Sequence, residues 1–155
     1  MLFRSHSAAF VEGWALYAET LGYEMGLYDD PVQRFGNLTS EMLRALRMVV
    51  DTELHYFGWS RQQAIDFMIG YLPYDHPDIV KEVDRYINYP GQAVSYKIGQ
   101  LKILGLRKKA QTALGSKFDI KEFHSKILES GTVSFQYLDK KIGSWIQGKL
   151  GKMQK

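Results

Sequence analysis

Apolar residues recur along most of the chain at the three- and four-residue spacing of a helix, and glycines and prolines interrupt the pattern. Alternating apolar and polar residues, which would indicate a half-buried strand, form no run of useful length. The sequence therefore predicts an all-α fold, a bundle of about six helices. The predicted helical segments are residues 8–25, 31–57, 61–71, 78–89, 92–114, 119–131 and 134–147.

Short signals mark where several of these helices begin and end. A capping residue followed three positions later by Gln or Glu occurs at Asp30, Ser60 and Asp119. Glycine suits the left-handed conformation that often ends a helix. The glycines that follow predicted helices are Gly26, Gly58, Gly115 and Gly131. Gly36 lies near the start of the second helix, and we expect it to weaken the first turns there.

Length and composition fit one globular domain. The chain has 155 residues, 45% of them hydrophobic, which is enough to bury a core. We expect a single helical domain over residues 1–148 and a polar, frayed tail over residues 149–155. The absence of cysteine excludes disulfides, thiolate metal sites and cysteine nucleophiles. No apolar run approaches the roughly 20 residues of a membrane span, and the first residues do not form a secretion signal.

Charge is distributed unevenly along the chain. Residues 1–90 carry 7 Lys and Arg against 13 Asp and Glu, a net of −6, whereas residues 91–155 carry 13 against 4, a net of +9. A nucleic-acid-binding patch and a lysine-rich solvated helix surface would both produce this basic half. Because no nucleic-acid-binding motif accompanies it, we favour the solvated surface and predict no nucleic-acid partner.

Two carboxylates lie on one face of the first predicted helix. Glu12 and Glu19 are seven residues apart and therefore share a face, beside the small residues Ala8 and Ala15. A carboxylate in such surroundings lies at the surface, pairs with a cation or binds a metal. From these residues alone, an arginine partner within the domain is favoured over a metal.

A polar stripe follows on the second long helix. Arg47, Asp51 and His55 are spaced at four-residue intervals. One interpretation is a ladder of ion pairs within the helix. The other is catalytic: Asp51 orients His55, which donates a proton or a hydrogen bond to a developing oxyanion.

A third polar segment runs from Arg85 to Tyr96 around Pro90-Gly91. A helix that starts after Pro-Gly leaves free N–H groups at Gln92 and its neighbours, which suits an anion. Tyr89 and Tyr96 add phenols and Arg85 adds a fixed cation, so the segment could bind a substrate carboxylate or an oxyanion. The alternative is a simple helix kink with packed tyrosines.

These segments, in this order, resemble a bacterial family known as domain of unknown function 885, over residues 10–145. The strings that carry the resemblance are residues 12–19 (EGWALYAE), 47–55 with 58–60, 82–86, 90–99 (PGQAVSYKIG), and 118–119 with 123–124. Members of this family are typically longer, often exported or lipid-anchored, and look like gluzincin-type zinc peptidases. They carry an upstream His-Glu-x-x-Pro-Gly-His segment, which this sequence lacks. The resemblance therefore implies the C-terminal part of a larger, helical metallopeptidase-like protein that is periplasmic or envelope-attached.

The resemblance also implies roles for individual residues in the intact protein. Glu12 would be the third zinc ligand beside two upstream histidines, and Glu19 would hydrogen-bond a ligand. The residues implied in catalysis are His55, Asp51, Arg85 and Tyr96, and those implied in peptide binding are Tyr89 and Gln92. This chain alone is predicted to hydrolyse no peptide and to bind zinc weakly at best, because one carboxylate cannot hold the metal against water. Position 53 is Glu, where the family usually has Gly.

Two other functions fit the same residues. A non-catalytic helical interaction module would use the polar stripes as ion-pair ladders. A basic binder of nucleic acid or of an envelope surface would use the lysines between Lys97 and Lys117. We also expect the chain to expose apolar surface that a missing portion would cover, and hence to self-associate, for example through the first helix.

Overall fold

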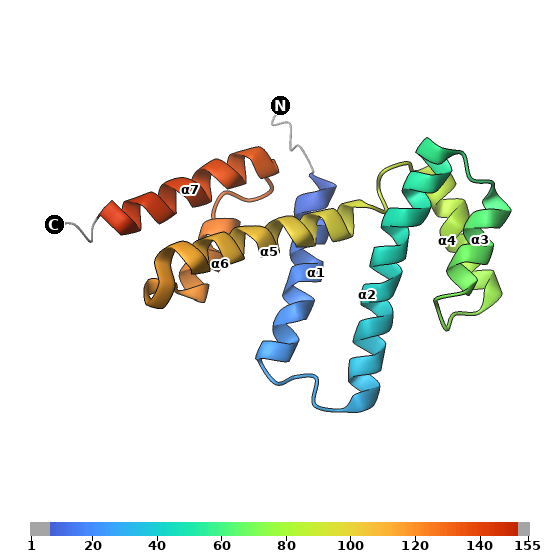
Figure 1. Ribbon diagram of the computed structural model, residues 1–155, viewed down its shortest axis with the longest axis horizontal. Coiled ribbons are helices and arrows are strands. Elements are labelled where there is room, and N and C mark those ends of the chain that lie inside the picture. The colour runs from blue at the N-terminus through green and yellow to red at the C-terminus, as the bar shows by residue number, and fades with distance from the viewer. Residues whose placement is uncertain (1–6, 152–155) are drawn as a thin grey trace.

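The computed structural model describes residues 7–151, and helices account for most of them. The α-helices are α1 (Ala8–Glu24), α2 (Pro31–Thr52), α3 (Arg61–Ile69), α4 (His76–Asn88), α5 (Ser95–Leu114), α6 (Ile120–Leu128) and α7 (Phe135–Gly151) (Figure 1). A π-helical turn, Glu53–Phe57, prolongs α2, and a 3-10 turn, Gly115–Lys117, follows α5. Residues 7–151 contain no strand, so the all-α prediction is confirmed. None of the described helices combines the length and the apolar character needed to cross a membrane.

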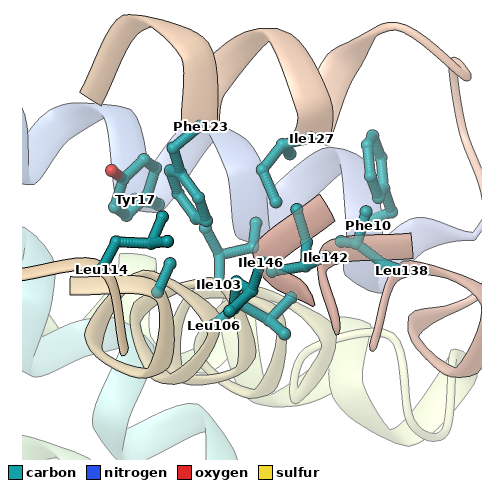
Figure 2. Packing of buried hydrophobic residues seen from close by; sticks show 11 residues of the cluster. Phe10, Tyr17, Ile103, Leu106, Leu114, Phe123, Ile127, Leu138, Ile142 and Ile146 are labelled. Atoms are coloured by element: carbon teal, nitrogen blue, oxygen red, sulfur yellow. The ribbon is translucent and has the colours of Figure 1, made fainter. Parts of the chain in front are cut away.

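The helices pack around two separate apolar cores, and α5 connects them (Figure 1). Burying a large apolar side chain contributes about 1.5–3 kcal/mol, so both cores stabilise the chain substantially. The first core, between α1, α5, α6 and α7, consists of Phe10, Tyr17, Ile103, Leu106, Ala110, Leu114, Phe123, Ile127, Leu138, Ile142 and Ile146 (Figure 2). The second, between α2, α3 and α4, consists of Leu43, Leu46, Val50, Ala64, Ile65, Met68, Leu72, Ile79, Val83, Tyr86 and Ala93.

Two glycines meet where α1 crosses α5, so the two backbones touch. A Cβ atom added to Gly99 would lie 1.9 Å from the carbonyl oxygen of Ala9 and 2.6 Å from Cα of Gly13. A Cβ atom added to Gly13 would lie 2.4 Å from Cα of Gly99. Only glycine fits at either position. The close crossing sets α1, which carries Glu12, against α5, which carries Tyr96.

A polar chain also joins α1, α5 and α6. The hydroxyl of Tyr17 lies 2.8 Å from Nε2 of His124. Arg107 donates to both carboxylate oxygens of Glu24, at 2.6 and 2.7 Å. Burial, and then the positive charge of Arg107, lowers the pKa of His124, so the neutral imidazole is favoured in this contact.

Helix starts follow the predicted caps, with differences in detail. Ser60 and Gln63 form the predicted capping box at α3. Asp119 accepts hydrogen bonds from the first turn of α6, but the side chain of Glu122 binds Trp145 instead of completing a box. Gly36 does not interrupt α2.

Other helix bounds differ from the predictions by one to four residues, and two of these differences bear on the site and on the predicted tail. α5 begins at Ser95 rather than at residue 92, because residues 90–94 form a turn. α7 continues to Gly151, past the predicted end at residue 147, so residues 148–151 are helical. The rest of the predicted tail, residues 152–155, lies outside the described residues.

Candidate functional site

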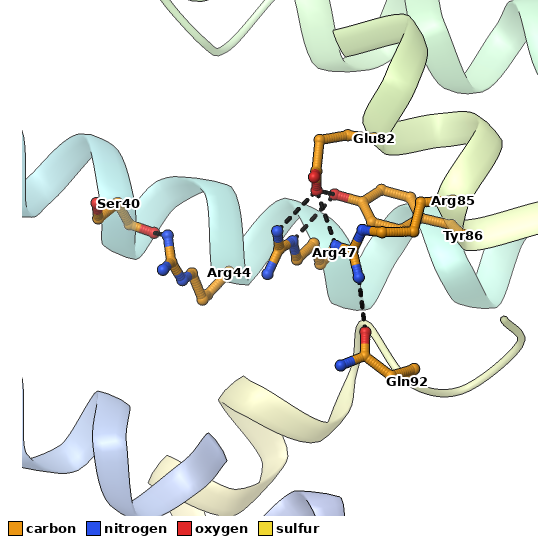
Figure 3. A network of polar contacts seen from close by, with 7 residues as sticks. All are labelled: Ser40, Arg44, Arg47, Glu82, Arg85, Tyr86 and Gln92. Atoms are coloured by element: carbon orange, nitrogen blue, oxygen red, sulfur yellow. Dashed lines mark hydrogen bonds and ion pairs between the residues drawn. The ribbon is translucent and has the colours of Figure 1, made fainter. Parts of the chain in front are cut away.

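A dense set of polar contacts joins α2, α4 and the turn before α5 (Figure 3). Arg47 donates from Nη2 to Oε2 of Glu82 at 2.7 Å and from Nε to the hydroxyl of Tyr86 at 3.0 Å. The same Glu82 oxygen accepts from Nη2 of Arg85 at 2.9 Å and from the Tyr86 hydroxyl at 2.7 Å. Nη1 of Arg85 donates to the side-chain oxygen of Gln92 at 2.8 Å. We call these five residues the Glu82 network.

Helical spacing explains how the network forms. Glu82, Arg85 and Tyr86 are three and four residues apart on α4, so one face of this helix presents all three. Arg47 lies on the face of α2 that is turned toward α4 and is only 7% exposed. A guanidinium buried so deeply needs a counter-charge and hydrogen-bond acceptors. The network supplies both and fixes α4 against α2.

The charges of the network favour an ionised Glu82. Burial alone would raise its pKa, but hydrogen bonds from Arg85, Tyr86 and Arg47 outweigh burial and lower the pKa to about 2. Burial raises the pKa of Tyr86, and the Glu82 carboxylate raises it further against the opposing charge of Arg47. Two guanidinium groups therefore surround one carboxylate, which leaves the network with an excess of positive charge.

The lowered pKa of Glu82 predicts an acid-sensitive part of the stability. The ordinary pKa of the carboxyl is 4.5 and the folded value is about 2, so its stabilisation is complete above pH 4.5 and is lost as the pH falls toward 2. The free energy of unfolding of the parent chain should fall between about pH 6 and pH 3 as Glu82 takes up a proton. In Glu82→Gln, which has no carboxyl group at this position, we expect that fall to be about 2 kcal/mol smaller. Urea unfolding at both pH values measures this difference. Asp84→Asn, in the exposed pair with Arg61, is the matched control, and an equal loss in both variants would contradict the assignment.

Tyr96 brings α5 next to this network. The guanidinium carbon of Arg47 lies 5.1 Å from the centre of the Tyr96 ring, and that of Arg44 lies 5.9 Å from it, both within cation–π range. Nη1 of Arg44 contacts the carbonyl oxygen of Ser40 at 3.4 Å, whereas its buried Nε has no hydrogen-bond partner among the described residues. Arg44 thus adds a third guanidinium, and one with an unused donor. A site of this charge suits a carboxylate or an oxyanion.

The stripe of Arg47, Asp51 and His55 has partners other than those predicted. Asp51, which is 4% exposed, accepts hydrogen bonds from the backbone N–H of Gly91 at 3.1 and 3.2 Å. Nε2 of His55 lies 3.0 Å from the carbonyl oxygen of Tyr86. These contacts replace both the predicted ladder and the predicted Asp51–His55 pair. All three side chains reach from α2 to α4 or to the turn that follows it.

The anion position predicted after Pro-Gly is taken by a side chain of the protein itself. Gly91 adopts a φ of 79° and directs its N–H to the Asp51 carboxylate. The N–H of Gln92 is bonded to the carbonyl oxygen of Tyr89 at 3.2 Å. Of the two residues predicted to bind peptide, Gln92 joins the Glu82 network, whereas the side chain of Tyr89 is 65% exposed.

Glu12 and Glu19 are half-buried on α1 and lie outside the Glu82 network. Glu12 shares a helix face with Leu16, one turn later. The carbonyl oxygen of Leu16 accepts from Nε2 of Gln100 at 3.3 Å, and the same nitrogen donates to Glu41 of α2 at 2.8 Å. Leu16, one turn after Glu12, therefore lies at the junction of α1, α5 and α2. Within residues 7–151, no group of three His, Cys, Asp or Glu side chains is placed to hold a metal ion.

Ion pairs offset part of the positive charge in the basic half. The pairs include Lys97 with Glu41, Lys102 with Asp139, and Arg107 with Glu24, and others join Lys126 and Lys141 to Glu129 and Lys149 to Glu122. Lys108, Lys109 and Lys117 are exposed on α5 and the turn after it. This distribution is the one expected for a solvated helix surface.

Four residues of the site, Glu82, Tyr86, Arg44 and Gln100, were not selected as site residues by the sequence analysis. Glu82 could have been found from the Glu-x-x-Arg-Tyr spacing on a predicted helix, because this spacing places both side chains beside it. Nothing in the sequence distinguished Arg44 from the other charged residues of the second helix. Gln100 gave no signal, because its partners lie 84 and 59 residues away in the sequence.

Comparison with known proteins identifies the family. The sequence matches the family described as "Bacterial protein of unknown function (DUF885)" over residues 1–142. No curated protein matches the chain. The crystal structure described as the putative lipoprotein from Colwellia psychrerythraea is similar, with a TM-score of 0.89 and 45% sequence identity. The match covers 91% of this chain and 24% of that one, so this chain spans about a quarter of that protein's length. The chain belongs to the DUF885 family of bacterial proteins of unknown function.

Proposed function

We propose that the chain is the C-terminal helical portion of a zinc-dependent peptidase, in which Glu12 is a zinc ligand and the residues around Tyr96 bind the peptide. The observation that carries the proposal is the excess of guanidinium groups over carboxylates beside Tyr96, on α5, which α1 contacts directly where Gly13 meets Gly99. A peptide brings a C-terminal carboxylate and, during hydrolysis, an oxyanion, and both are recognised by such groups. The family match and the quarter-length overlap with a longer relative support a role as one part of a larger protein.

A carboxylate at position 12 fits the chemistry of zinc. Two imidazoles and one carboxylate leave a zinc position open, and the metal then supplies Lewis acidity and an activated water. Glu12 would provide the carboxylate, and Glu19, on the same face of α1, would hydrogen-bond a ligand. The two histidines would come from the His-Glu-x-x-Pro-Gly-His segment that the family resemblance implies outside this sequence.

The remaining residues would bind and orient the substrate. The Arg44 guanidinium would add positive charge that attracts a substrate carboxylate, while the hydroxyl of Tyr96 would donate to the oxyanion. Arg85 is already shared between Glu82 and Gln92 and would contribute positive charge. Asp51 and His55 would act as positioning residues, because they bind the backbone of Gly91 and Tyr86.

Substituting the ligand tests the proposal in a family member that carries the upstream segment. We expect the equivalent of Glu12→Gln to lower peptide hydrolysis by about 100-fold or more and to reduce the bound zinc, with an unchanged helical circular dichroism spectrum. The equivalent of Glu24→Gln, on the same helix but paired with Arg107, is the control. Unchanged hydrolysis in the Glu12 variant would favour a non-catalytic interaction module instead. For the present chain, calorimetry should detect zinc binding no tighter than about millimolar, and a tight stoichiometric site would contradict the proposal that the site is incomplete.

A further inference from the structure

α2 exposes an apolar stripe beside its buried side. Phe35, Met42, Val49 and Tyr56 follow each other at seven-residue intervals along α2 and its π-helical end, and Leu38 lies between the first two. Their exposed fractions range from 40% to 80%. A seven-residue repeat keeps Phe35, Met42 and Val49 on one side of α2, and Tyr56 follows them on the π-helical turn. We call these five residues the α2 stripe.

The α2 stripe is separate from the side of α2 that packs inside the chain. Leu43, Leu46 and Val50 are buried in the second core, so α2 has one covered and one uncovered apolar side. The lower half of α2 extends beyond α3, α4 and α5 in Figure 1. Neither the stripe nor the positions that complete its repeat, Ala45 and Thr52, carry a charge. Interface cores share this depletion of charged residues.

The size of the stripe is that of a small but specific interface. From residue 35 to residue 56 a helix rises about 31 Å. Val32, which is 77% exposed, lies next to the stripe. Multiplying the exposed fractions of these six residues by typical side-chain areas gives on the order of 600 Å² of apolar surface. Two such surfaces bury about 1,200 Å², the lower end of the range for stable protein interfaces. By contrast, the large apolar residues that α1 exposes, Val11 and Tyr23, are twelve residues apart.

We propose that the α2 stripe pairs with the α2 stripe of a second copy of the chain, in antiparallel orientation. Side-chain sizes favour this orientation. With the two-fold axis between residues 42 and 45, Phe35 faces Thr52 of the second copy, and Met42 faces Ala45 of the second copy. Each of these two large side chains then meets a small one, and Leu38 faces Val49 of the second copy. A parallel pair would instead place Phe35 against Phe35 and Ala45 against Ala45, which alternates crowded and empty layers.

The antiparallel pairing also closes on itself. The same surface is used by both copies, so the assembly ends at a dimer and forms no open chain. This proposal assigns self-association to α2, whereas the sequence analysis suggested the first helix. It requires neither zinc nor the upstream segment, so it is independent of the proposed peptidase function.

Sedimentation equilibrium of the full chain between about 1 µM and 500 µM tests the pairing. We expect a dimer fraction that rises with concentration and a dissociation constant at least about 100-fold higher for Met42→Glu, because the pairing would bury the new charge. Tyr137→Glu changes a residue of α7 that is 50% exposed and should leave the dimer unchanged. The substituted positions are exposed, and circular dichroism checks that the helices are retained. A monomer at every concentration overturns the proposal. The stripe would then be a surface that, in longer relatives, the residues outside the match cover. Equal dimerisation of the Met42→Glu variant also overturns it.

Cross-linking tests the orientation, because the chain has no cysteine of its own. Residues 35 and 52 are about 26 Å apart along the helix. In the antiparallel pair, an equimolar mixture of the Phe35→Cys and Thr52→Cys chains should form a mixed disulfide under mild oxidation, and Phe35→Cys alone should remain uncross-linked. A disulfide formed by Phe35→Cys alone overturns the antiparallel arrangement.

Discussion

Replacing Gly99 with alanine is expected to destabilise the chain by about 3 kcal/mol, at the upper end of the range for an overpacked position. The new Cβ would lie 1.9 Å from the carbonyl oxygen of Ala9 and 2.6 Å from Cα of Gly13. Both neighbours are backbone atoms of α1, so no side chain can rotate away. The helices must separate instead, which loosens the first core on both sides of the crossing.

A glycine in the same helix provides the control. Gly105 lies inside α5 with no atom within 4 Å of the position that a Cβ would occupy. Gly105→Ala is therefore expected to raise the free energy of unfolding by about 0.5–1 kcal/mol, because alanine is the better helix former. Urea denaturation of both variants gives the comparison. A Gly99→Ala chain as stable as the parent would show that α1 and α5 do not touch through their backbones.

Local signals in the sequence were enough to predict the helices, but not how the helices meet. Ser60 and Asp119 cap their helices as predicted, since a cap depends on residues only three positions apart. Gly58 and Gly115 adopt the positive φ expected where a helix ends. The contact between Gly13 and Gly99 has no comparable signal, because it depends on two residues that are far apart in the chain.

The same distinction applies to the candidate site. The sequence analysis selected Asp51, Arg85 and Gln92, and the structure places all three at the junction of α2, α4 and the turn before α5. It assigned the wrong partner to Asp51, because residues four apart on a helix are neighbours whether or not they interact. Asp51 is buried toward the Gly91 turn, and its partner lies 40 residues away in the sequence. Tertiary contacts thus gave Asp51 a partner that helical spacing alone could not predict.

Arg47→Met is expected to lower the free energy of unfolding by about 3 kcal/mol, because removing one member of a buried ion pair leaves the other without its partner. Met retains much of the apolar length of the side chain, so the loss reports on the charge and the hydrogen bonds. Glu82 would keep the hydrogen bonds from Arg85 and Tyr86, and its side chain is 26% exposed. For both reasons, the expected loss is at the lower end of the range for buried pairs. The Tyr86 hydroxyl would lose its donor from Arg47.

An exposed pair on the same helix gives the matched control. Arg61 binds Asp84 of α4 with two hydrogen bonds, but both side chains are nearly half exposed, so Arg61→Met should cost no more than about 1 kcal/mol. The double variant Arg47→Met with Glu82→Gln should recover part of the loss, since no unpaired carboxylate then remains. Equal losses for Arg47→Met and Arg61→Met would show that burial adds nothing to the Glu82 network. Its excess charge would then be an ordinary surface feature, and the proposed binding of a peptide carboxylate beside Tyr96 would lose its physical basis.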